Sequence, residues 1–259
     1  MVKYIATELI KLGYKPGIVS RGYGGKFKET LKVTNETPVK QTGDEAQILS
    51  TLNIPFYIDK NRVRALKTLN DNHDCDVIIS DDGLQHYNMN RDVEIVVIDG
   101  KRRFGNNLSF PAGPLRESLK RLDSVDFIVN NSGPTEDGEH LMNVSPAKFI
   151  HLKSGKTYSV EEWPMHKQVH AVAGLGNPGR FFDLLARLGF DITRNPFPDH
   201  HNFISEDVHY LDHLPIIMTE KDASKCKDFN NNKIWYLTIE AEVSSKFIEE
   251  LDNKLKNLS

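Results

Sequence analysis

Apolar and polar positions alternate with two different periods along the first 130 residues. Short runs of valine and isoleucine recur, and such runs are typical of parallel strands that helices cover on both faces. The predicted strands are 17–20, 56–59, 76–80, 93–99 and 126–130. Apolar residues at helical spacing predict helices over 44–52 and 60–70. This alternation predicts an α/β domain over 1–131 that is built on a parallel sheet.

The first segment reads as the second half of a strand–helix–strand unit. Apolar residues from Val2 to Ile10 recur at helical spacing, and Gly13 ends the predicted helix before the strand at 17–20. No capping residue and no strand stands before Met1. Because a helix that leads into a parallel strand normally follows an earlier strand, we expect the first strand of this unit to be missing.

Two further regions complete the predicted organisation. The pattern weakens over 132–167, which we interpret as a linker with a β-ribbon. A second, smaller α/β domain is predicted over 168–259. Its strands are 168–174, 214–221 and 233–239, and its helices are 179–190 and a C-terminal segment that begins after Ser244.

The composition is that of an ordinary soluble protein. Of the 259 residues, 39% are hydrophobic and 27% are charged, and the formal charge of −3 gives no indication of a nucleic-acid partner. Cys75 and Cys226 lie far apart and outside any metal-ligand spacing, which favours a reducing compartment. The longest apolar run, at 93–99, is much shorter than a membrane span.

The segment DVIISDDGLQH (76–86) is the strongest candidate for chemistry. Its strand delivers Asp81 and Asp82 to the edge where open α/β sheets bind ligands. Mg²⁺ prefers oxygen ligands, and many nucleotide-dependent phosphotransferases hold it with a strand-end aspartate. Adjacent aspartates also make ordinary turns. Gln85 and His86 in the same loop favour the functional interpretation.

The segment QTGDEAQIL (41–49) has two interpretations. Thr42 or Asp44 is able to cap a helix, and acidic residues suit a helix start. Alternatively, Asp44 or Glu45 receives the proton of a substrate hydroxyl during phosphoryl transfer. Taken by itself, the segment favours the cap.

Two loops give weaker indications of ligand contact. SRGYGGK (20–26) follows a strand, its glycines permit close approach of a ligand, and Arg21 is able to pair with phosphate. FPAGPLRESLKRL (110–122) is predicted to enter a helix with Arg116 and Glu117 in the first turn. The helix dipole does not favour an arginine there, so this loop also indicates a ligand.

The segment AGLGNPGRFF (173–182) matches the dinucleotide fingerprint G-x-G-x-x-G at Gly174, Gly176 and Gly179. Pro178 falls within the fingerprint, and the block that follows is too short for a full dinucleotide fold. A tight turn from strand to helix is therefore the favoured interpretation of these glycines.

Histidines gather in the second domain. His200 and His201 lie in the loop FPDHHNF, where one histidine is able to orient a catalytic carboxylate. A zinc site that adds His209 and His213 is disfavoured, because HYLDH lacks the glutamate of H-E-x-x-H. We expect His209 and His213 to be partly exposed helix residues.

Seven motifs in this order resemble the tetraacyldisaccharide 4′-kinase family. They are SRGYGGK, GDEAQ, SDDGLQH, PAGPLRES, AGLGNPGRFF, PDHHNF and TEKDASK, and the likeness runs from residue 1 to about residue 240. The resemblance implies a P-loop NTPase-like parallel sheet with flanking helices and a smaller C-terminal α/β domain. It implies ATP and Mg²⁺ as cofactors. The implied reaction phosphorylates the 4′-hydroxyl of the tetraacyldisaccharide 1-phosphate precursor of lipid A, at the cytoplasmic face of the bacterial inner membrane.

The resemblance also implies roles for individual residues. Asp44 would be the general base with His200 as its partner, and Asp81, Asp82 and Gln85 would serve the metal. The residues that would line the nucleotide or substrate site are Arg21, Tyr23, Glu45, His86, Arg116 and Glu117. The implied partners are the lipid A disaccharide precursor and the membrane surface, with no nucleic acid. No oligomeric state is implied.

The family's phosphate-binding loop, G-x-x-x-x-G-K-[ST], has no counterpart in the 259 residues. The resemblance implies that it should immediately precede the first helix, where its N–H groups and lysine would hold the phosphates. The family's membrane-associated N-terminal helix is also missing, so we expect this chain to be soluble. Because the phosphate-binding loop is absent from these residues, we expect impaired kinase activity. The alternative is a non-catalytic chain that binds acylated sugar or a partner protein.

Overall fold

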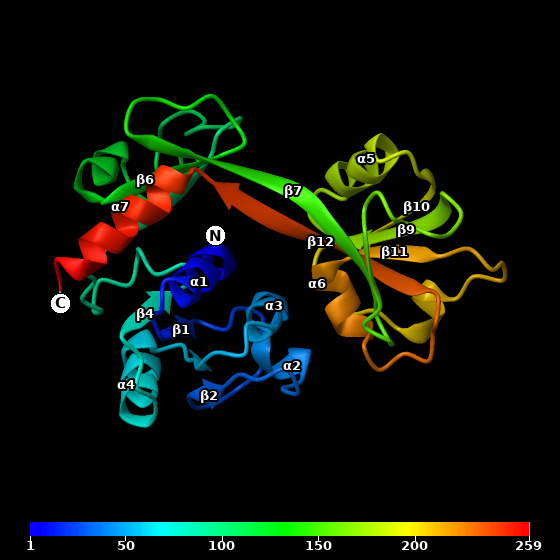
Figure 1. Ribbon diagram of the computed structural model, residues 1–259, viewed down its shortest axis with the longest axis horizontal. Coiled ribbons are helices and arrows are strands. Elements are labelled where there is room, and N and C mark those ends of the chain that lie inside the picture. Colours follow the sequence, from blue (N-terminus) through cyan, green and yellow to red (C-terminus); the bar gives the residue numbers. More distant parts are fainter. Residues whose placement is uncertain (259) are drawn as a thin grey trace.

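The first eighty residues build a small sheet from three of the five strands predicted for 1–131 and one strand that was not predicted, whereas the strands predicted at 93–99 and 126–130 belong to the other sheet. In the computed structural model, which describes residues 1–258, this four-stranded sheet has the order β2-β3-β1-β4 (Figure 1). Its strands are β1 (Pro16–Ser20), β2 (Leu31–Lys32), β3 (Phe56–Ile58) and β4 (Val77–Ser80). β1 pairs in parallel with β3 and β4, and β2 adds an antiparallel edge. Every residue of β1 is buried, as the unbroken apolar run predicts.

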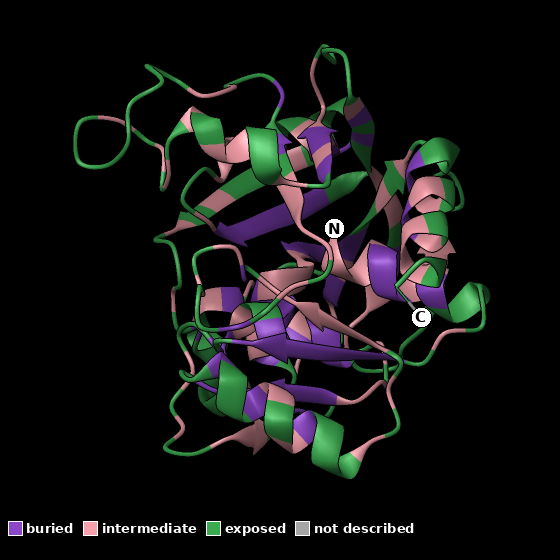
Figure 2. Ribbon diagram, turned by 90° about the vertical axis from the view of Figure 1, so that its left-hand side faces the viewer, coloured by how far each residue is buried: buried purple, intermediate pink, exposed green. Residues whose placement is uncertain are grey.

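Helices cover this sheet with their apolar faces. α1 (Val2–Lys11) buries Ile5 and Leu9 and begins without a side-chain cap. α4 (Arg62–Asn72) buries Leu69, which packs in one cluster with residues of β1 and β3. Figure 2 shows the buried residues on the strands and on the inner faces of the helices.

The remaining strands form one eight-stranded sheet with the order β10-β9-β11-β12-β7-β6-β5, in which β8 pairs with β7. They are β5 (Ile95–Asp99), β6 (Phe127–Asn131), β7 (Glu139–His151), β8 (Thr157–Ser159), β9 (Gln168–Gly174), β10 (Asp191–Phe197), β11 (Ile216–Thr219) and β12 (Ile234–Val243). β7 and β12 are antiparallel and run from one lobe of the molecule to the other (Figure 1). Their register shifts between Leu237 and Ile239, which marks a bulge. The β-ribbon predicted for 132–167 thus includes β7 and β8.

The other helices are short, apart from the last one. They are α2 (Val39–Thr42), α3 (Asp44–Ser50), α5 (Gly179–Arg187), α6 (Glu220–Ala223), α7 (Ser245–Lys256) and the 3₁₀ helices η1 (Leu119–Ser124), η2 (Ser205–Val208) and η3 (Ser224–Cys226). No helix in the described part of the chain is long and apolar enough to cross a membrane.

The two lobes have separate hydrophobic cores. In the C-terminal lobe, which holds β8–β11, α5 and α6, the ring of Phe149 lies 4.7 Å from Trp163 and 5.3 Å from Phe190. In the N-terminal lobe, Phe247 of α7 packs against Phe127 at 5.4 Å. The end of the chain, which the sequence groups with 168–259, therefore completes the core of the other lobe.

Several local predictions are wrong. The strand predicted over 214–221 ends at Thr219, because the Thr219 side chain accepts a hydrogen bond from the Asp222 N–H and caps α6. Phe197, the first residue of the predicted loop FPDHHNF, belongs to β10, since it continues the parallel pairing of β10 with β9.

The predicted helix that begins at Arg116 and Glu117 is also wrong, because both residues precede η1, which begins at Leu119. His209 and His213 are exposed, but they follow η2 in a loop and do not belong to a helix.

A cavity of about 1100 Å³ lies in the N-terminal lobe. β4 is the edge of one sheet and β5 is the edge of the other, and both strands line the cavity. Its apolar wall includes Ile79 of β4, Ile95 and Val97 of β5, and residues of α1 and α7. Val97 is 45% exposed, which is high for a residue in a run of valine and isoleucine. Within residues 1–258, β4 pairs only with β1 and β5 only with β6.

Candidate functional site

The carboxyl ends of β1 and β4 lie side by side. Val19 of β1 pairs with Ser80 of β4, so the loops that follow leave the sheet together. The Ser20 hydroxyl donates a hydrogen bond to Asp81 Oδ2 at 3.4 Å. Burial and the adjacent Asp82 carboxylate raise the pKa of Asp81. A half-buried carboxylate beside a second carboxylate favours a cation as ligand.

Three buried polar atoms at this strand end have no hydrogen-bond partner among residues 1–258: Arg62 Nε, Ser80 Oγ and His86 Nε2. Arg62 is 6% exposed, and its Nη2 donates to the main-chain oxygen of Asp81 at 2.9 Å. Burial lowers the pKa of both Arg62 and His86. Because buried polar groups are normally paired, this cluster fits a polar ligand with acceptor and donor groups.

An exposed network continues from Asp82. Arg116 Nη1 donates to Asp82 Oδ1 at 2.6 Å, and Gln85 Nε2 donates to Glu117 Oε1 at 2.7 Å. The Asp82 and Arg116 side chains are about two-thirds exposed, so their ion pair contributes little to stability and is easily exchanged for a ligand. Asp81, Asp82, Gln85, Arg116 and Glu117 all line the polar end of the cavity.

These side chains suit Mg²⁺, which proteins commonly hold with one or two carboxylates while substrate phosphates complete the coordination. Asp81 and Asp82 provide two carboxylates, and Gln85 provides an amide oxygen. No group of three or more His, Cys, Asp or Glu side chains that could hold a metal ion by itself occurs within residues 1–258.

Asp44 is the first residue of α3, and glycine packing fixes its position. Gly43 has a φ of +82°, and a Cβ there would lie 2.1 Å from the main-chain oxygen of Tyr23. A Cβ on Gly25 would lie 2.3 Å from the main-chain oxygen of Gln41. The glycines of loop 20–26 and Gly43 therefore allow that loop to pack directly against the start of α3.

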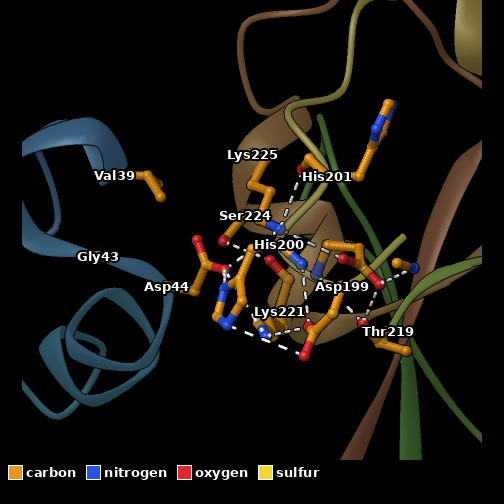
Figure 3. Close-up of polar contacts among 12 residues, drawn as sticks. Val39, Gly43, Asp44, Asp199, His200, His201, Thr219, Lys221, Ser224 and Lys225 are labelled. Atoms are coloured by element: carbon orange, nitrogen blue, oxygen red, sulfur yellow. Dashed lines mark hydrogen bonds and ion pairs between the residues drawn. The ribbon is translucent and has the colours of Figure 1, made fainter. Parts of the chain in front are cut away.

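The Asp44 carboxylate meets the C-terminal lobe, as Figure 3 shows. Its Oδ2 lies 3.3 Å from His200 Nδ1, 3.2 Å from Lys225 Nζ and 3.8 Å from Lys221 Nζ. The loop that carries His200 is held by Asp199, whose Oδ1 accepts the His200 N–H at 2.9 Å. The Lys221 ammonium, 3.2 Å from Asp199, lowers the pKa of that carboxyl. Asp44 and His200 are thus in contact although 156 residues separate them.

Tyr23 and Glu45 lie beside this contact, whereas the charge of Arg21 acts on Arg62 and His86 at the strand-end site. The ring of Tyr23 is 6.2 Å from that of His200 and is largely exposed. Glu45 is exposed on the first turn of α3, and Arg21 is exposed at the end of β1.

His201 has a different environment from His200. Its Nε2 lies 2.8 Å from Asp207 Oδ2, and its ring packs between Phe197 and Phe203. These contacts give His201 a structural role.

The sequence assigned no role to Arg62, and Lys221, Asp222 and Lys225 appeared only within the motif TEKDASK, with no role for any of them. The segment T-E-K-D at 219–222 has the pattern of a helix cap, and a helix there puts Lys221 and Lys225 one turn apart. The same helix explains the fingerprint-like turn, because the Gly174 N–H donates to Asp222 Oδ2 at 2.9 Å.

Paired aspartates at a strand end, buried arginine nitrogens beside them and a carboxylate–histidine contact between two lobes are typical of a nucleotide-dependent phosphotransferase. The family model described as tetraacyldisaccharide-1-P 4′-kinase (LpxK) matches residues 1–256. The chain therefore belongs to the tetraacyldisaccharide 4′-kinase family, whose members are transferases of lipid A biosynthesis.

Two relatives named tetraacyldisaccharide 4′-kinase illustrate the match. The protein from Ruthia magnifica subsp. Calyptogena magnifica is 46% identical, over 97% of this chain and 80% of the relative. The protein from Shewanella frigidimarina is 41% identical, over 100% of this chain and 77% of the relative. The chain thus spans about four fifths of the length of these relatives.

A solved structure is similar as well. The crystal structure of LpxK from Aquifex aeolicus in complex with ATP has a TM-score of 0.81 and 24% identity, over 99% of this chain and 82% of that chain. The likeness confirms the predicted α/β, P-loop NTPase-like fold class.

Proposed function

We propose that this protein transfers the γ-phosphoryl group of ATP to the 4′-hydroxyl of the tetraacyldisaccharide 1-phosphate precursor of lipid A. The observation that carries the proposal is the contact between Asp44 and His200 across the two lobes. Family membership supports the reaction type, and the acceptor is the one that the names of the relatives give.

Asp44 acts as the general base in this proposal. A positioned carboxylate accepts the proton of the attacking hydroxyl as the new bond to phosphorus forms. The contact atoms of His200, Lys221 and Lys225 all lie nearest Asp44 Oδ2, which leaves Oδ1 to face the hydroxyl. His200 contacts the carboxylate from the other lobe, so the site is complete only when the two lobes meet.

The second part of the proposed site is the end of β4. Asp81, Asp82 and Gln85 would hold Mg²⁺. Bound Mg²⁺–ATP supplies the phosphoryl group and neutralises the charge on its oxygens. The remaining lining is assigned to Arg21, Tyr23, Glu45, His86, Arg116 and Glu117. Among these, the arginines offer planar, charged donors for phosphate.

The substrate places the reaction at a membrane surface. Its four acyl chains are apolar and its sugar is polar, so we propose that the protein meets it at the cytoplasmic face of the bacterial inner membrane. Association is then peripheral for the described residues, none of whose helices is able to span a bilayer.

Residues 1–259 contain no G-x-x-x-x-G-K-[ST] motif. Phosphoryl transfer depends mainly on positioning and charge stabilisation, so we propose that residues 1–259 alone are a weak kinase. The cavity edged by β4 and β5 supports this, because two unpaired parallel edges leave room for one further strand. The alternative is a chain that binds acylated sugar without catalysis.

The test measures transfer of labelled phosphate from ATP to tetraacyldisaccharide 1-phosphate, separated by thin-layer chromatography. It compares two proteins. One is residues 1–259, and the other is extended upstream of the Met1 codon for as far as the reading frame stays open. We expect the reaction in the longer protein. If neither protein phosphorylates the lipid but the lipid binds without ATP, the alternative of binding without catalysis holds.

The role of Asp44 is tested by Asp44→Asn in whichever form is active. We expect kcat to fall by about 10²- to 10⁴-fold, as for loss of a general base, with KM for ATP little changed. Asp71→Asn, at an exposed aspartate of α4, is the matched control. Full activity of Asp44→Asn would contradict the proposal.

A further inference from the structure

We propose that Lys225 is the positioning residue for Asp44, and that the buried carboxylate of Asp222 holds Lys225 in place. We call the chain of contacts Asp222–Lys225–Asp44 the relay. That it serves catalysis rests on the proposed function. The contacts themselves, between α3 and the α6–η3 segment, do not depend on that function (Figure 3).

Asp222 is fully buried and anchors the relay. Its Oδ2 accepts hydrogen bonds from the Gly174 N–H at 2.9 Å and from the Thr219 hydroxyl at 2.7 Å. Its Oδ1 has no hydrogen bond within residues 1–258 and lies 3.5 Å from Lys225 Nζ. A buried carboxylate requires a compensating charge, and Lys225 supplies it.

Lys225 stands between two carboxylates. Its side chain is 9% exposed, and its Nζ lies 3.5 Å from Asp222 Oδ1 and 3.2 Å from Asp44 Oδ2. It also donates to the main-chain oxygen of His201 at 3.2 Å. The last contact ties the lysine to the loop that carries His200, so one ammonium group fixes both the carboxylate and its histidine partner.

The other polar groups near Asp44 are less suited to this role. His200 is 51% exposed, and its nitrogen is 3.3 Å from the carboxylate. Lys221 is 3.8 Å from Asp44 and closer, at 3.2 Å, to Asp199. Water screens exposed pairs strongly and buried pairs much less, so the shielded Lys225 contact sets the direction of the Asp44 carboxylate.

The experiment detects the His200–Asp44 contact by NMR and does not require kinase activity. Long-range ¹H–¹⁵N spectra of histidine-labelled protein report the His200 Nδ1 resonance, assigned with His200→Gln. We expect Lys225→Met to shift this resonance by at least about half of the displacement that Asp44→Ala causes. Lys225→Arg, which keeps the charge, should restore most of the wild-type position.

The matched control is Lys233→Met. Lys233 belongs to the same lobe, and its Nζ donates to the main-chain oxygens of Tyr210 and Asp212, away from Asp44. It should leave the His200 resonance unchanged. A folded Lys225→Met protein with a wild-type His200 resonance would overturn the proposal. If Lys225→Met does not fold, Asp222→Asn is measured instead, with the same two outcomes.

Kinetics then separate this proposal from the proposed function. In the active form, Lys225→Met should lower kcat by about 10²-fold at unchanged KM for ATP, because a small misplacement of a reacting group has this effect. Lys225→Arg should recover part of the loss. If Asp44→Asn keeps full activity, the proposed function fails, whereas the spectra still decide whether Lys225 positions Asp44.

Discussion

Gly43 offers a sharp test of how the chain positions Asp44. In Gly43→Ala, the new Cβ would lie 2.1 Å from the main-chain oxygen of Tyr23, at a backbone φ of +82°. The backbone conformation alone costs an L-residue about 1–3 kcal/mol, and overlap in a packed region adds a similar amount. We therefore expect the free energy of unfolding to fall by about 3 kcal/mol.

Gly24→Ala is the control for this prediction. Gly24 lies in the adjacent loop with a φ of +77°, but a Cβ there would have no atom within 4 Å. It should lose only about 1 kcal/mol, since only the backbone conformation is disfavoured. Urea unfolding followed by far-UV circular dichroism measures both values. Equal losses in the two variants would refute the reasoning that close packing at Gly43 fixes Asp44.

Two further predictions concern buried titratable groups. Burial and Asp82 raise the pKa of Asp81 in the folded state, so its neutral form is favoured and stability is lost as the pH rises through that folded value. Asp81→Asn should therefore raise Tm at about pH 7.5 but not at about pH 3, where the carboxyl is protonated in both states, and a gain equal at both pH values would contradict this. Burial raises the pKa of Cys226 to about 12, whereas Cys75 is partly exposed. An aromatic disulfide reagent should modify Cys75 first and Cys226 only in urea, and two equally fast thiols in the native protein would argue against the described core.

Local patterns in the sequence were sufficient for β1 and β4, the two strands that lead into the candidate site. The runs that became β1 and β4 are short, apolar and followed by glycine or aspartate, and these signals depend only on neighbouring residues. The expected position of Asp81 and Asp82 at a strand end is correct for the same reason.

Contacts between distant segments could not be predicted from such patterns. Lys225 reaches Asp44 only because the α6–η3 segment and α3 meet across the two lobes, and no periodicity in the sequence indicates that contact. Likewise, the amphipathic pattern of α7 predicts a helix with one buried face, but it does not say which lobe that face covers. The capping pattern at Thr219 is visible in the sequence, and it predicts that the strand ends there and that α6 begins.

The ribbon formed by β7 and β12 has a mechanical consequence. β7 has 13 residues, so it extends over about 40 Å and joins the two lobes by paired main chains. Relative motion of the lobes must bend or twist this strand pair. The deformation energy of the pair therefore rises with the angle between the lobes. At the bulge, the Thr238 hydroxyl accepts a hydrogen bond from the Lys148 N–H and donates one to the Lys148 carbonyl. Separation of Asp44 from His200 therefore has to flex paired strands that resist bending, unlike the free swing of a disordered linker.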